Sequence, residues 1–474
     1  MNKYKRLATD TILFAISNFG SKFLILLLVP LYTSVLSTEE YGISDLITTT
    51  VNLLYPILTL AICEAVLRYA MQKDTDPKLV LKNALWLVVI SSVLLCFAKP
   101  LVSLVLKELC DYWWYFVLIY FLYNLHLCLA NYTKAIDKTR LFAIQGITQT
   151  VFVILSNIVL LLKFKMGIHG YIISIIVGYC AAIIIMIISG KYAFLFKFSK
   201  IDFSLMKEML TYSIPMIPAI LSWWINTSAD KYMIIAFIGI SASGLYSVAH
   251  KIPTIVITVT NIFNQAWQLA AIKNRGEEDE STFHTSIYNA LYLISLFVCM
   301  LVIPFSKIIS DILFAKEFYV AWQYAPYLLI GTIFSALSGF LASAFRAAKK
   351  TKILLASVLV GAGVNIILNI FLINALGVLG ATLATMIGFM VLWLQRIVFV
   401  QKIVVVRINW MKTVLSYLIL IAGTSLIVFE IKFAYIIYAL FAALIIAVNY
   451  KESKSYIIQV LSTVKKMLIK RKPV

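Results

Sequence analysis

Long apolar segments follow one another along almost the whole chain, and the polar breaks between them are short. Most segments reach about 20 residues or more, the length that an α-helix needs to cross the ~30 Å hydrocarbon core of a bilayer. The pattern therefore predicts an all-α integral membrane protein with fourteen transmembrane helices. The predicted spans are residues 9–35, 41–67, 83–106, 112–133, 141–162, 168–190, 208–237, 242–271, 284–306, 319–345, 353–373, 377–400, 411–429 and 433–450.

The eighth predicted span carries polar residues at alternating spacings of four and three. This periodicity places them on one helical face about 31 Å long. Polar side chains within a membrane are costly unless they meet protein partners or water, so we expect this face to line a hydrated cavity. Hydrogen bonding inside a tightly packed bundle is the alternative, because it uses the same residue types. The positions are Ser247, Lys251, Thr254, Thr258, Asn261, Gln265 and Gln268.

The chain also contains an internal repeat. Basic residues at 134–140 recur 212 positions later at 346–352, and Gly42-Ile43 recurs as Gly244-Leu245, 202 positions later. Six spans separate the copies, an even number, so both halves have the same orientation in the membrane. We expect two six-helix lobes related by a pseudo-two-fold axis, two additional helices, and a basic amphipathic tail on the inner membrane surface. The corresponding ranges are 1–200, 201–405, 406–450 and 451–474.

Composition agrees with this class, because 62% of the 474 residues are hydrophobic and only 13% are charged. The net charge of +20 is distributed asymmetrically: thirty basic residues, Arg346 and Arg396 among them, fall in alternate breaks and the tail, against six on the opposite side. This positive-inside bias predicts that both termini are cytoplasmic. Basic residues in alternate loops contact anionic lipids, whereas a nucleic-acid binder gathers them on a folded soluble surface. We therefore expect membrane lipids as partners and no nucleic acid.

Ionisable residues inside the predicted spans are the first candidates for function. Lys22, Lys231 and Lys251 place positive charge within the membrane region, which suits an anionic substrate such as phosphate or pyrophosphate. Arg68 is a fourth candidate for this cationic, substrate-binding set. It follows Glu64 by four residues, so a local ion pair is an equally good interpretation.

Further candidates follow from the repeat. Subtracting 202 from the polar face places Asp45, Thr49 and Asn52 at equivalent positions of the second span, and Asn18 shares a helical face with Lys22. We predict that Asp45, Asn52 and Asn18 line the cavity together with the polar face of the eighth span.

Three residues are candidates for ion coupling: Asp230, His250 and Glu64. A carboxylate or imidazole at membrane depth can exchange H⁺ or Na⁺ as its surroundings open and close. Asp230 adjoins Lys231, so neutralisation of that lysine is the alternative interpretation.

Several chemistries are not expected. The chain has no G-x-x-x-x-G-K-[ST] phosphate loop, so ATP is not the energy source within it. Its six cysteines show no paired spacing, so we expect neither a disulfide framework nor a metal site, and no cofactor. No segment is long enough for a soluble catalytic domain, so the chain is not expected to be an enzyme.

Motifs in the middle of the chain resemble those of Wzx-type polysaccharide flippases, in the multidrug/oligosaccharidyl-lipid/polysaccharide exporter superfamily. They are Tyr212-Ser213-Ile214-Pro215, Ser222-Trp223-Trp224, Ala229-Asp230-Lys231-Tyr232, Gly244-Leu245-Tyr246-Ser247, Lys251-Ile252-Pro253 and Asn264-Gln265-Ala266-Trp267-Gln268. The resemblance implies fourteen helices in two lobes plus two, and residence in the bacterial cytoplasmic (inner) membrane. It also implies the substrate, an undecaprenyl-pyrophosphate-linked oligosaccharide such as an O-antigen or capsule unit, moved to the outer leaflet by alternating access and driven by an ion gradient.

Two positions depart from the family pattern. Lys231 stands where arginine is common, which keeps the charge but loses bidentate geometry. His250 stands where an aromatic or small polar residue is expected.

Rival functions remain open at this point. One is another branch of the superfamily: a peptidoglycan-precursor or teichoic-acid flippase, or a drug/cation antiporter, although a cation exporter should show more acids than bases. A membrane glycan polymerase or ligase would need a large outer loop with catalytic residues, and a scaffold would not need the polar face. Glycan polymerase machinery is a candidate partner of a flippase.

Overall fold

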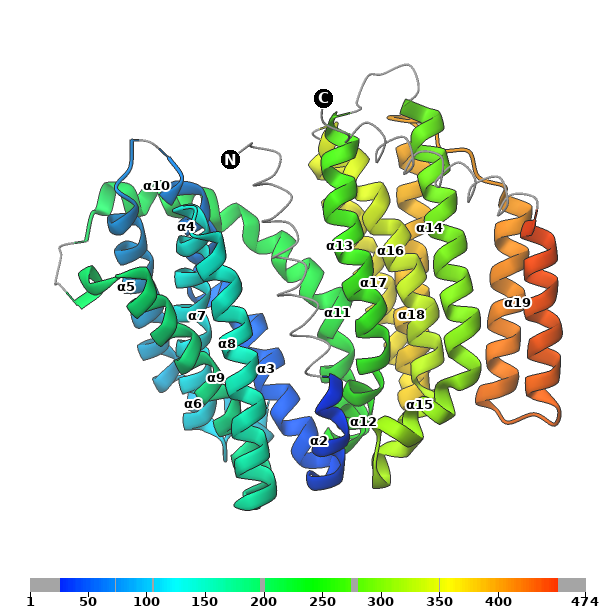
Figure 1. The fold of residues 1–474 in the computed structure, drawn as a ribbon, viewed down its shortest axis with the longest axis horizontal. Coiled ribbons are helices and arrows are strands. Elements are labelled where there is room, and N and C mark those ends of the chain that lie inside the picture. Colours follow the sequence, from blue (N-terminus) through cyan, green and yellow to red (C-terminus); the bar gives the residue numbers. More distant parts are fainter. Residues whose placement is uncertain are drawn as a thin grey trace, which may run out of the picture. The chain divides into compact units, whose positions relative to one another are not determined.

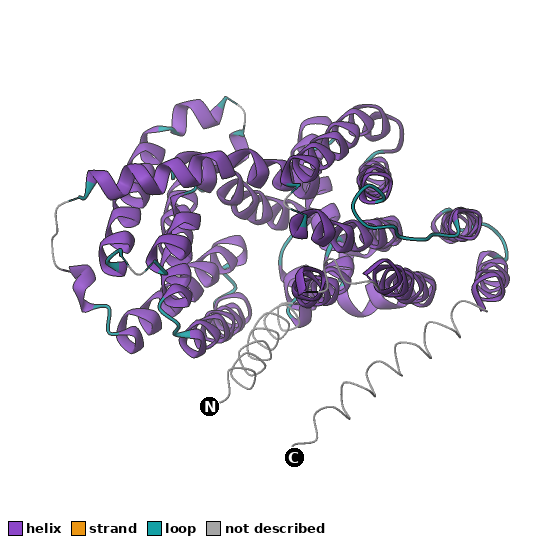
Figure 2. Ribbon diagram, turned by 90° about the horizontal axis from the view of Figure 1, so that it is seen from above, coloured by secondary structure: helices purple, strands orange, loops and turns teal. Residues whose placement is uncertain are grey.

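The computed structural model describes residues 26–450, apart from 73, 105, 197–200, 274–279 and 349, and omits a few side chains within helices. Every regular element in this described part of the chain is a helix, as Figure 2 shows. The helices separate into two compact units. One ends at Val248 and includes Leu313–Phe318; the other begins at Ala249.

The first unit contains the helices up to α12 (Figure 1). Its elements are α2 Val29–Val35, α3 Thr38–Leu58, α4 Ile62–Ala70, α5 Pro77–Phe97, α6 Lys99–Ser103, α7 Trp113–Ala135, α8 Thr139–Asn157 with a π-helical extension Ile158–Lys163, α9 Gly167–Gly190, α10 Phe203–Ser213, α11 Ile217–Phe237 and α12 Ile240–Ala249.

The second unit continues from α13. Its elements are α13 Lys251–Lys273, α14 Glu280–Val302, α15 Ser306–Leu313, α16 Ala325–Ala347, α17 Thr351–Leu376, α18 Val378–Val400, α19 Trp410–Val428 and a last helix, Ala434–Tyr450. Almost the whole of α16 is buried, so this helix forms the core of its unit.

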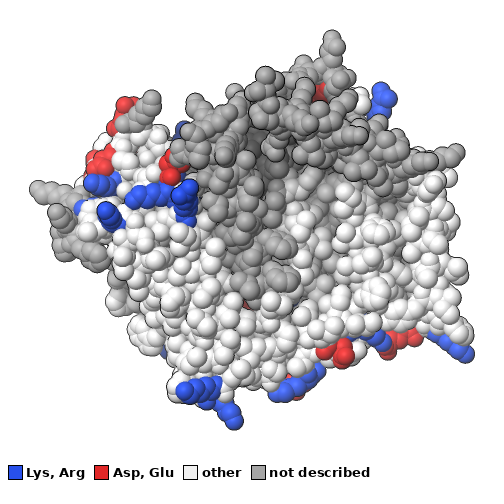
Figure 3. All heavy atoms as spheres, viewed as in Figure 1, with Lys and Arg blue, Asp and Glu red and all other residues white. Residues whose placement is uncertain are grey.

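The prediction of an all-α membrane protein is confirmed. Within the described residues, nine helices are long and apolar enough to cross a membrane, and α3 with α4 makes a tenth if the bent pair is one span. Every predicted span from 41–67 onward corresponds to a described helix or to consecutive helices; the first, 9–35, lies mostly outside the described residues. Figure 3 shows most of the visible charged side chains near the upper and lower margins of the face drawn, while the described surface between them is mainly white, as expected of a protein embedded in lipid.

The helix bounds reproduce the internal repeat. α7 and α16 begin 212 positions apart and also end 212 positions apart, and α8 and α17 begin at the same offset. Lys138 and Lys350, which precede α8 and α17, adopt nearly the same backbone conformation (φ −89°, ψ 53° and φ −92°, ψ 55°). The compact units divide the chain inside the second predicted lobe, so the lobe boundaries at 200 and 405 stay a prediction.

The second predicted span is broken rather than continuous. α3 and α4 meet at 65°, just after Pro56, and Leu60 and Ala61 between them have positive φ angles of 54° and 52°. Proline removes a helical hydrogen bond and a left-handed residue ends the helix, so both favour a break here. The Ser213 hydroxyl donates to the Leu60 carbonyl at 2.8 Å and so satisfies one of the freed backbone groups.

Candidate functional site

The site begins at a close crossing of α3 and α12, both in the first unit. Gly42 of α3 packs on the carbonyl of Ile240, and Gly244 of α12 packs on the carbonyl of Thr38; a Cβ at either glycine would overlap the facing oxygen. Each glycine thus contacts the first residue of the other helix. Gly42 and Gly244 are repeat equivalents, and so are Thr38 and Ile240, because both pairs are separated by 202 positions. The crossing is therefore self-complementary.

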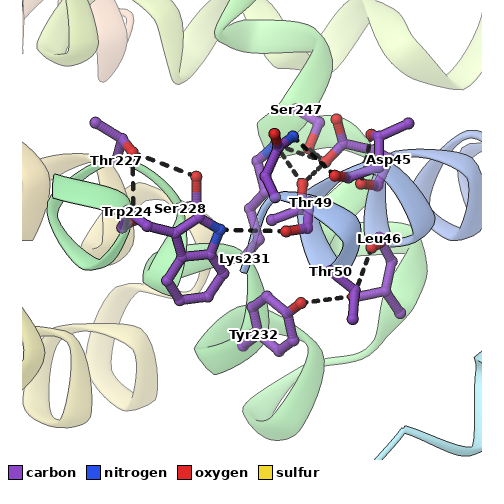
Figure 4. Close-up of polar contacts among 12 residues, drawn as sticks. Asp45, Leu46, Thr49, Thr50, Trp224, Thr227, Ser228, Lys231, Tyr232 and Ser247 are labelled. Carbon is purple, nitrogen blue, oxygen red and sulfur yellow. Dashed lines mark hydrogen bonds and ion pairs between the residues drawn. The ribbon is translucent and has the colours of Figure 1, made fainter. Parts of the chain in front are cut away.

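Asp45 of α3 accepts hydrogen bonds from side chains of two other helices, as Figure 4 shows. Ser247 of α12 donates to Asp45 Oδ2 at 2.8 Å, and Lys231 Nζ of α11 lies 2.6 Å from the same oxygen. Thr49 lies 3.4 Å from both Asp45 Oδ2 and Lys231 Nζ. Three predicted site residues, Asp45, Ser247 and Lys231, are thus brought together.

Aromatic residues hold α11 against α3 at this point. The indole of Trp224 donates to the Thr49 carbonyl at 3.2 Å, and the hydroxyls of Thr50 and Tyr232 share a hydrogen bond of 2.6 Å (Figure 4). The rings of Trp224 and Tyr232 meet edge to face, with centroids 5.4 Å apart. Because these contacts flank Lys231 on both sides in sequence, they fix the ammonium beside Asp45.

The electrostatic state of Lys231 follows from this geometry. The side chains of Lys231 and Asp45 are 15% and 16% exposed, so the pair is largely but not fully dehydrated. A charge-assisted hydrogen bond is strengthened by partial burial. The charge of Lys231 is therefore balanced by Asp45, and an anionic ligand would have to compete with Asp45 for the ammonium.

Asp230, although next to Lys231 in sequence, has a different partner. The hydroxyl of Tyr246 donates to Asp230 Oδ2 at 2.7 Å, and both side chains are buried. The ion pair of Lys231 is formed with Asp45. Asp230, the sequence neighbour of Lys231, and Asp45, its ion-pair partner, are thus two different residues of the same unit.

Glu64 and Arg68 of α4 also have separate surroundings. The Arg68 guanidinium lies 4.4 Å above the ring of Tyr212, in a cation–π contact. Glu64 is half-buried, and Lys134 of α7 is the basic residue that attracts it. No ion pair joins Glu64 to Arg68 in the described part of the chain, so the local-pair interpretation was wrong.

The predicted polar face continues into the second unit. Lys251 is the first residue of α13 and follows His250 at the break after α12. The hydroxyls of Thr254 and Thr258 donate to the carbonyls four residues earlier, each at 2.7 Å. Asn261 is exposed.

Other predicted residues lie elsewhere. Asn52 is exposed on α3, and its amide donates to the Thr48 carbonyl at 2.8 Å. The oxygen of Gln268 accepts a hydrogen bond from Arg346 at 3.3 Å. The side chain of Gln265, and all of Asn18 and Lys22, lie outside the described residues.

Sequence reasoning missed one buried cation by grouping Arg396 with the cytoplasmic basic residues. The structure places Arg396 inside α18, where it is 5% exposed. The signal was present in the sequence, because the predicted span 377–400 includes this position. No group of His, Cys, Asp and Glu side chains within the described residues could hold a metal ion.

Comparison with known proteins identifies the family. Residues 7–268, more than half of the chain, match the family described as polysaccharide biosynthesis protein. The chain belongs to this family. Residues 220–371 also match the MatE family. The superfamily resemblance seen in the sequence motifs is therefore confirmed. A search of curated proteins finds no match.

Solved transporter structures share the fold. The lipid II flippase MurJ, in an inward closed conformation, matches with a TM-score of 0.68 and 16% identity, over 92% of this chain and 99% of its own. An inward-facing multidrug resistance MATE transporter gives 0.62 and 14%, over 82% and 97%. A MOP superfamily transporter from Pyrococcus furiosus gives 0.60 and 12%, over 83% and 95%. At these identities the likeness shows the fold alone: this chain has the all-α fold of flippases and transporters.

Proposed function

We propose that this polysaccharide biosynthesis protein is a flippase that moves an undecaprenyl-pyrophosphate-linked oligosaccharide across the bacterial cytoplasmic membrane by alternating access. The family match over residues 7–268 carries the proposal, because it joins a transporter fold to polysaccharide synthesis. The glycan would be a repeat unit of a surface polysaccharide such as O-antigen or capsule. The positive-inside distribution supports cytoplasmic termini, and the polymerase that consumes the flipped unit is the proposed partner.

The substrate's pyrophosphate would compete with Asp45 for Lys231. The ammonium is close enough to Asp45 for a strong charge-assisted bond, yet remains 15% exposed and reachable. When Lys231 turns to pyrophosphate, Asp45 keeps the hydroxyl donors Ser247 and Thr49. The carboxylate is therefore not left without hydrogen bonds, which lowers the cost of the exchange. Lys22, Lys251 and Arg68 are proposed as further cations for the same anion.

Ion coupling is proposed for three buried or half-buried titratable residues. Asp230 is 1% exposed and holds the Tyr246 hydroxyl, so a change in its charge would alter the contact between α11 and α12. Glu64, beside Lys134, is the second candidate, and His250 at the break between α12 and α13 is the third. We propose that H⁺ or Na⁺ exchange at one of these groups drives the transport cycle.

The test is a deletion strain complemented with the intact gene or with the variant Lys231→Met. Without the flippase, undecaprenyl-linked oligosaccharide should accumulate on the inner leaflet and surface glycan should disappear. Membrane fractions would be assayed for lipid-linked glycan accessible from the cytoplasmic side. Unchanged surface glycan in the deletion strain would contradict the proposal.

Drug or cation antiport is the second candidate, supported by the MatE match over residues 220–371. The same strain separates the two functions. An antiporter would leave the lipid-linked glycan unchanged and would instead alter resistance to cationic dyes.

A further inference from the structure

Arg396 of α18 crosses to two neighbouring helices of the second unit. Its Nε donates to Ser357 Oγ of α17 at 3.1 Å, and its Nη1 donates to the Ser338 carbonyl and hydroxyl of α16 at 3.0 and 2.9 Å. Both serines are 1% exposed and Arg396 itself is 5% exposed. A guanidinium has five N–H donors, and these contacts use three of them.

Among the described residues, no carboxylate forms an ion pair with Arg396. Within the described residues its hydrogen-bond acceptors are neutral serine oxygens, and Nη2 makes no hydrogen bond there. Burying a cation without an anionic partner is energetically unfavourable, so such groups are normally paired. The unused donors and the unbalanced charge both favour an anion at this position.

A second arginine adds to the imbalance. Arg346, near the C-terminal end of α16, is exposed, and its Nη1 donates to Gln268 of α13 at 3.3 Å. It is close enough to Arg396 for the two charges to repel each other. Arg346 and Arg396 lie near the C-terminal ends of α16 and α18. The positive-inside bias predicts that these ends are cytoplasmic, so both arginines belong to the predicted cytoplasmic half of the unit.

The repeat supplies an internal control for the serine pair. Ser338 and Ser357 correspond, at the offset of 212, to His126 and Gln145 of the first unit. There the His126 ring nitrogen and the Gln145 oxygen bond directly at 2.6 Å, without any charged bridge. Packing of this helix pair therefore does not require a buried arginine.

The repeat supplies a second control for Arg346. Its equivalent in the first unit is Lys134, which is attracted by the Glu64 carboxylate. Arg346 has no carboxylate partner within the described residues. The first unit thus pairs its basic residue at this position with one of its own carboxylates, whereas in the described part of the second unit neither Arg346 nor Arg396 has a carboxylate partner.

We propose that Arg346 and Arg396 bind the phosphate of a lipid headgroup that enters from the predicted cytoplasmic side. Planar guanidinium groups match phosphate oxygens bidentately, and basic pockets between transmembrane helices bind lipid headgroups. The phosphate comes either from the isoprenoid pyrophosphate of the substrate or from an anionic phospholipid. The isoprenoid source rests on the function proposed above; the phospholipid source does not.

Binding to the purified full chain in nanodiscs tests the site. The probes are undecaprenyl pyrophosphate and phosphatidylglycerol, with undecaprenol as the probe that lacks phosphate. We expect Arg346→Gln and Arg396→Lys each to weaken phosphate-lipid binding about tenfold, as expected for loss of one charge-assisted contact. Undecaprenol binding should not change. Arg407→Gln is the matched control, because Arg407 is an exposed basic residue of the same unit and lies in the connection between α18 and α19.

The outcomes are separable. Loss for undecaprenyl pyrophosphate alone supports a substrate site, and loss for both phosphate lipids supports a general headgroup site. Loss for phosphatidylglycerol in a protein that never binds undecaprenyl pyrophosphate supports the site but counts against the flippase proposal. Affinities within twofold of the unaltered protein, or an equal loss in Arg407→Gln, overturn the inference. Arg346→Gln alone decides if Arg396→Lys does not fold, since Arg346 is exposed.

Discussion

Replacement of Lys231 by Met isolates the contribution of the Asp45–Lys231 pair. The change removes the ammonium 2.6 Å from Asp45 Oδ2 and leaves the carboxylate 16% exposed, with Ser247 and Thr49 as remaining donors. A fully exposed pair contributes at most about 1 kcal/mol, and removing one partner of a buried pair costs about 3–5 kcal/mol. Since the pair lies between these limits, we expect Lys231→Met to lower the free energy of unfolding by about 2 kcal/mol.

Asp45→Asn should destabilise the protein by a similar amount, because it leaves Lys231 without its counterion. The double variant should lose about 1.5 kcal/mol less than the sum of the two single changes, since each residue acts mainly through the other. Thermal unfolding of the purified protein, monitored by intrinsic tryptophan fluorescence, measures all three. Lys207→Met is the control, because it removes an exposed lysine of the same unit.

Ligand binding separates a structural pair from a substrate-competing one. If pyrophosphate takes Lys231 from Asp45, Asp45→Asn removes the competitor and should tighten undecaprenyl pyrophosphate binding, whereas Lys231→Met should weaken it about tenfold. The opposite signs are the decisive feature. Changes of the same sign in both variants, or additive stabilities in the double variant, would refute the reasoning.

Three further predictions concern other positions. Gly244→Ala should destabilise the fold by about 1–3 kcal/mol, because its Cβ overlaps a backbone carbonyl. Gly363→Ala, at an open helical position, should be neutral or stabilising. Thermal unfolding compares the two variants, and equal effects would contradict the packing argument. Ser213→Ala should cost about 1 kcal/mol by leaving a carbonyl unsatisfied at the α3–α4 break, and unchanged stability would show that another donor replaces it. Lys251→Ala should reduce export of surface glycan without reducing the amount of protein in membrane fractions; normal glycan would exclude a role for this residue.

The spans and the repeat could be predicted from the sequence because both depend on local periodicity. Hydrophobic length places the described helices to within several residues, and the offset of 202 aligns Asp45 with Ser247, whose side chains lie 2.8 Å apart. The break after Pro56 was not predicted. Positive φ angles at Leu60 and Ala61, two residues that rarely adopt them, leave no signature in a hydropathy pattern.

Pairings between helices could not be predicted in the same way. The sequence offered Asp230 as the neighbour of Lys231, whereas the structure pairs that lysine with Asp45, 186 positions away. Arg396 shows a second limit, because a residue within a turn or two of a helix end can be read either as a loop residue or as a buried one. Only the position of the two adjoining helices decides between them.

The crossing of α3 and α12 has a consequence for the history of the chain. Two repeat-equivalent glycines each pack there on a backbone carbonyl of the other helix, which is the property of a two-fold dimer contact. Two identical half-length polypeptides, each contributing one such helix, would meet through this interface without any change of sequence. In such a dimer, a larger side chain at that glycine would create two clashes at once. In the single chain, a substitution at Gly42 or at Gly244 creates only one.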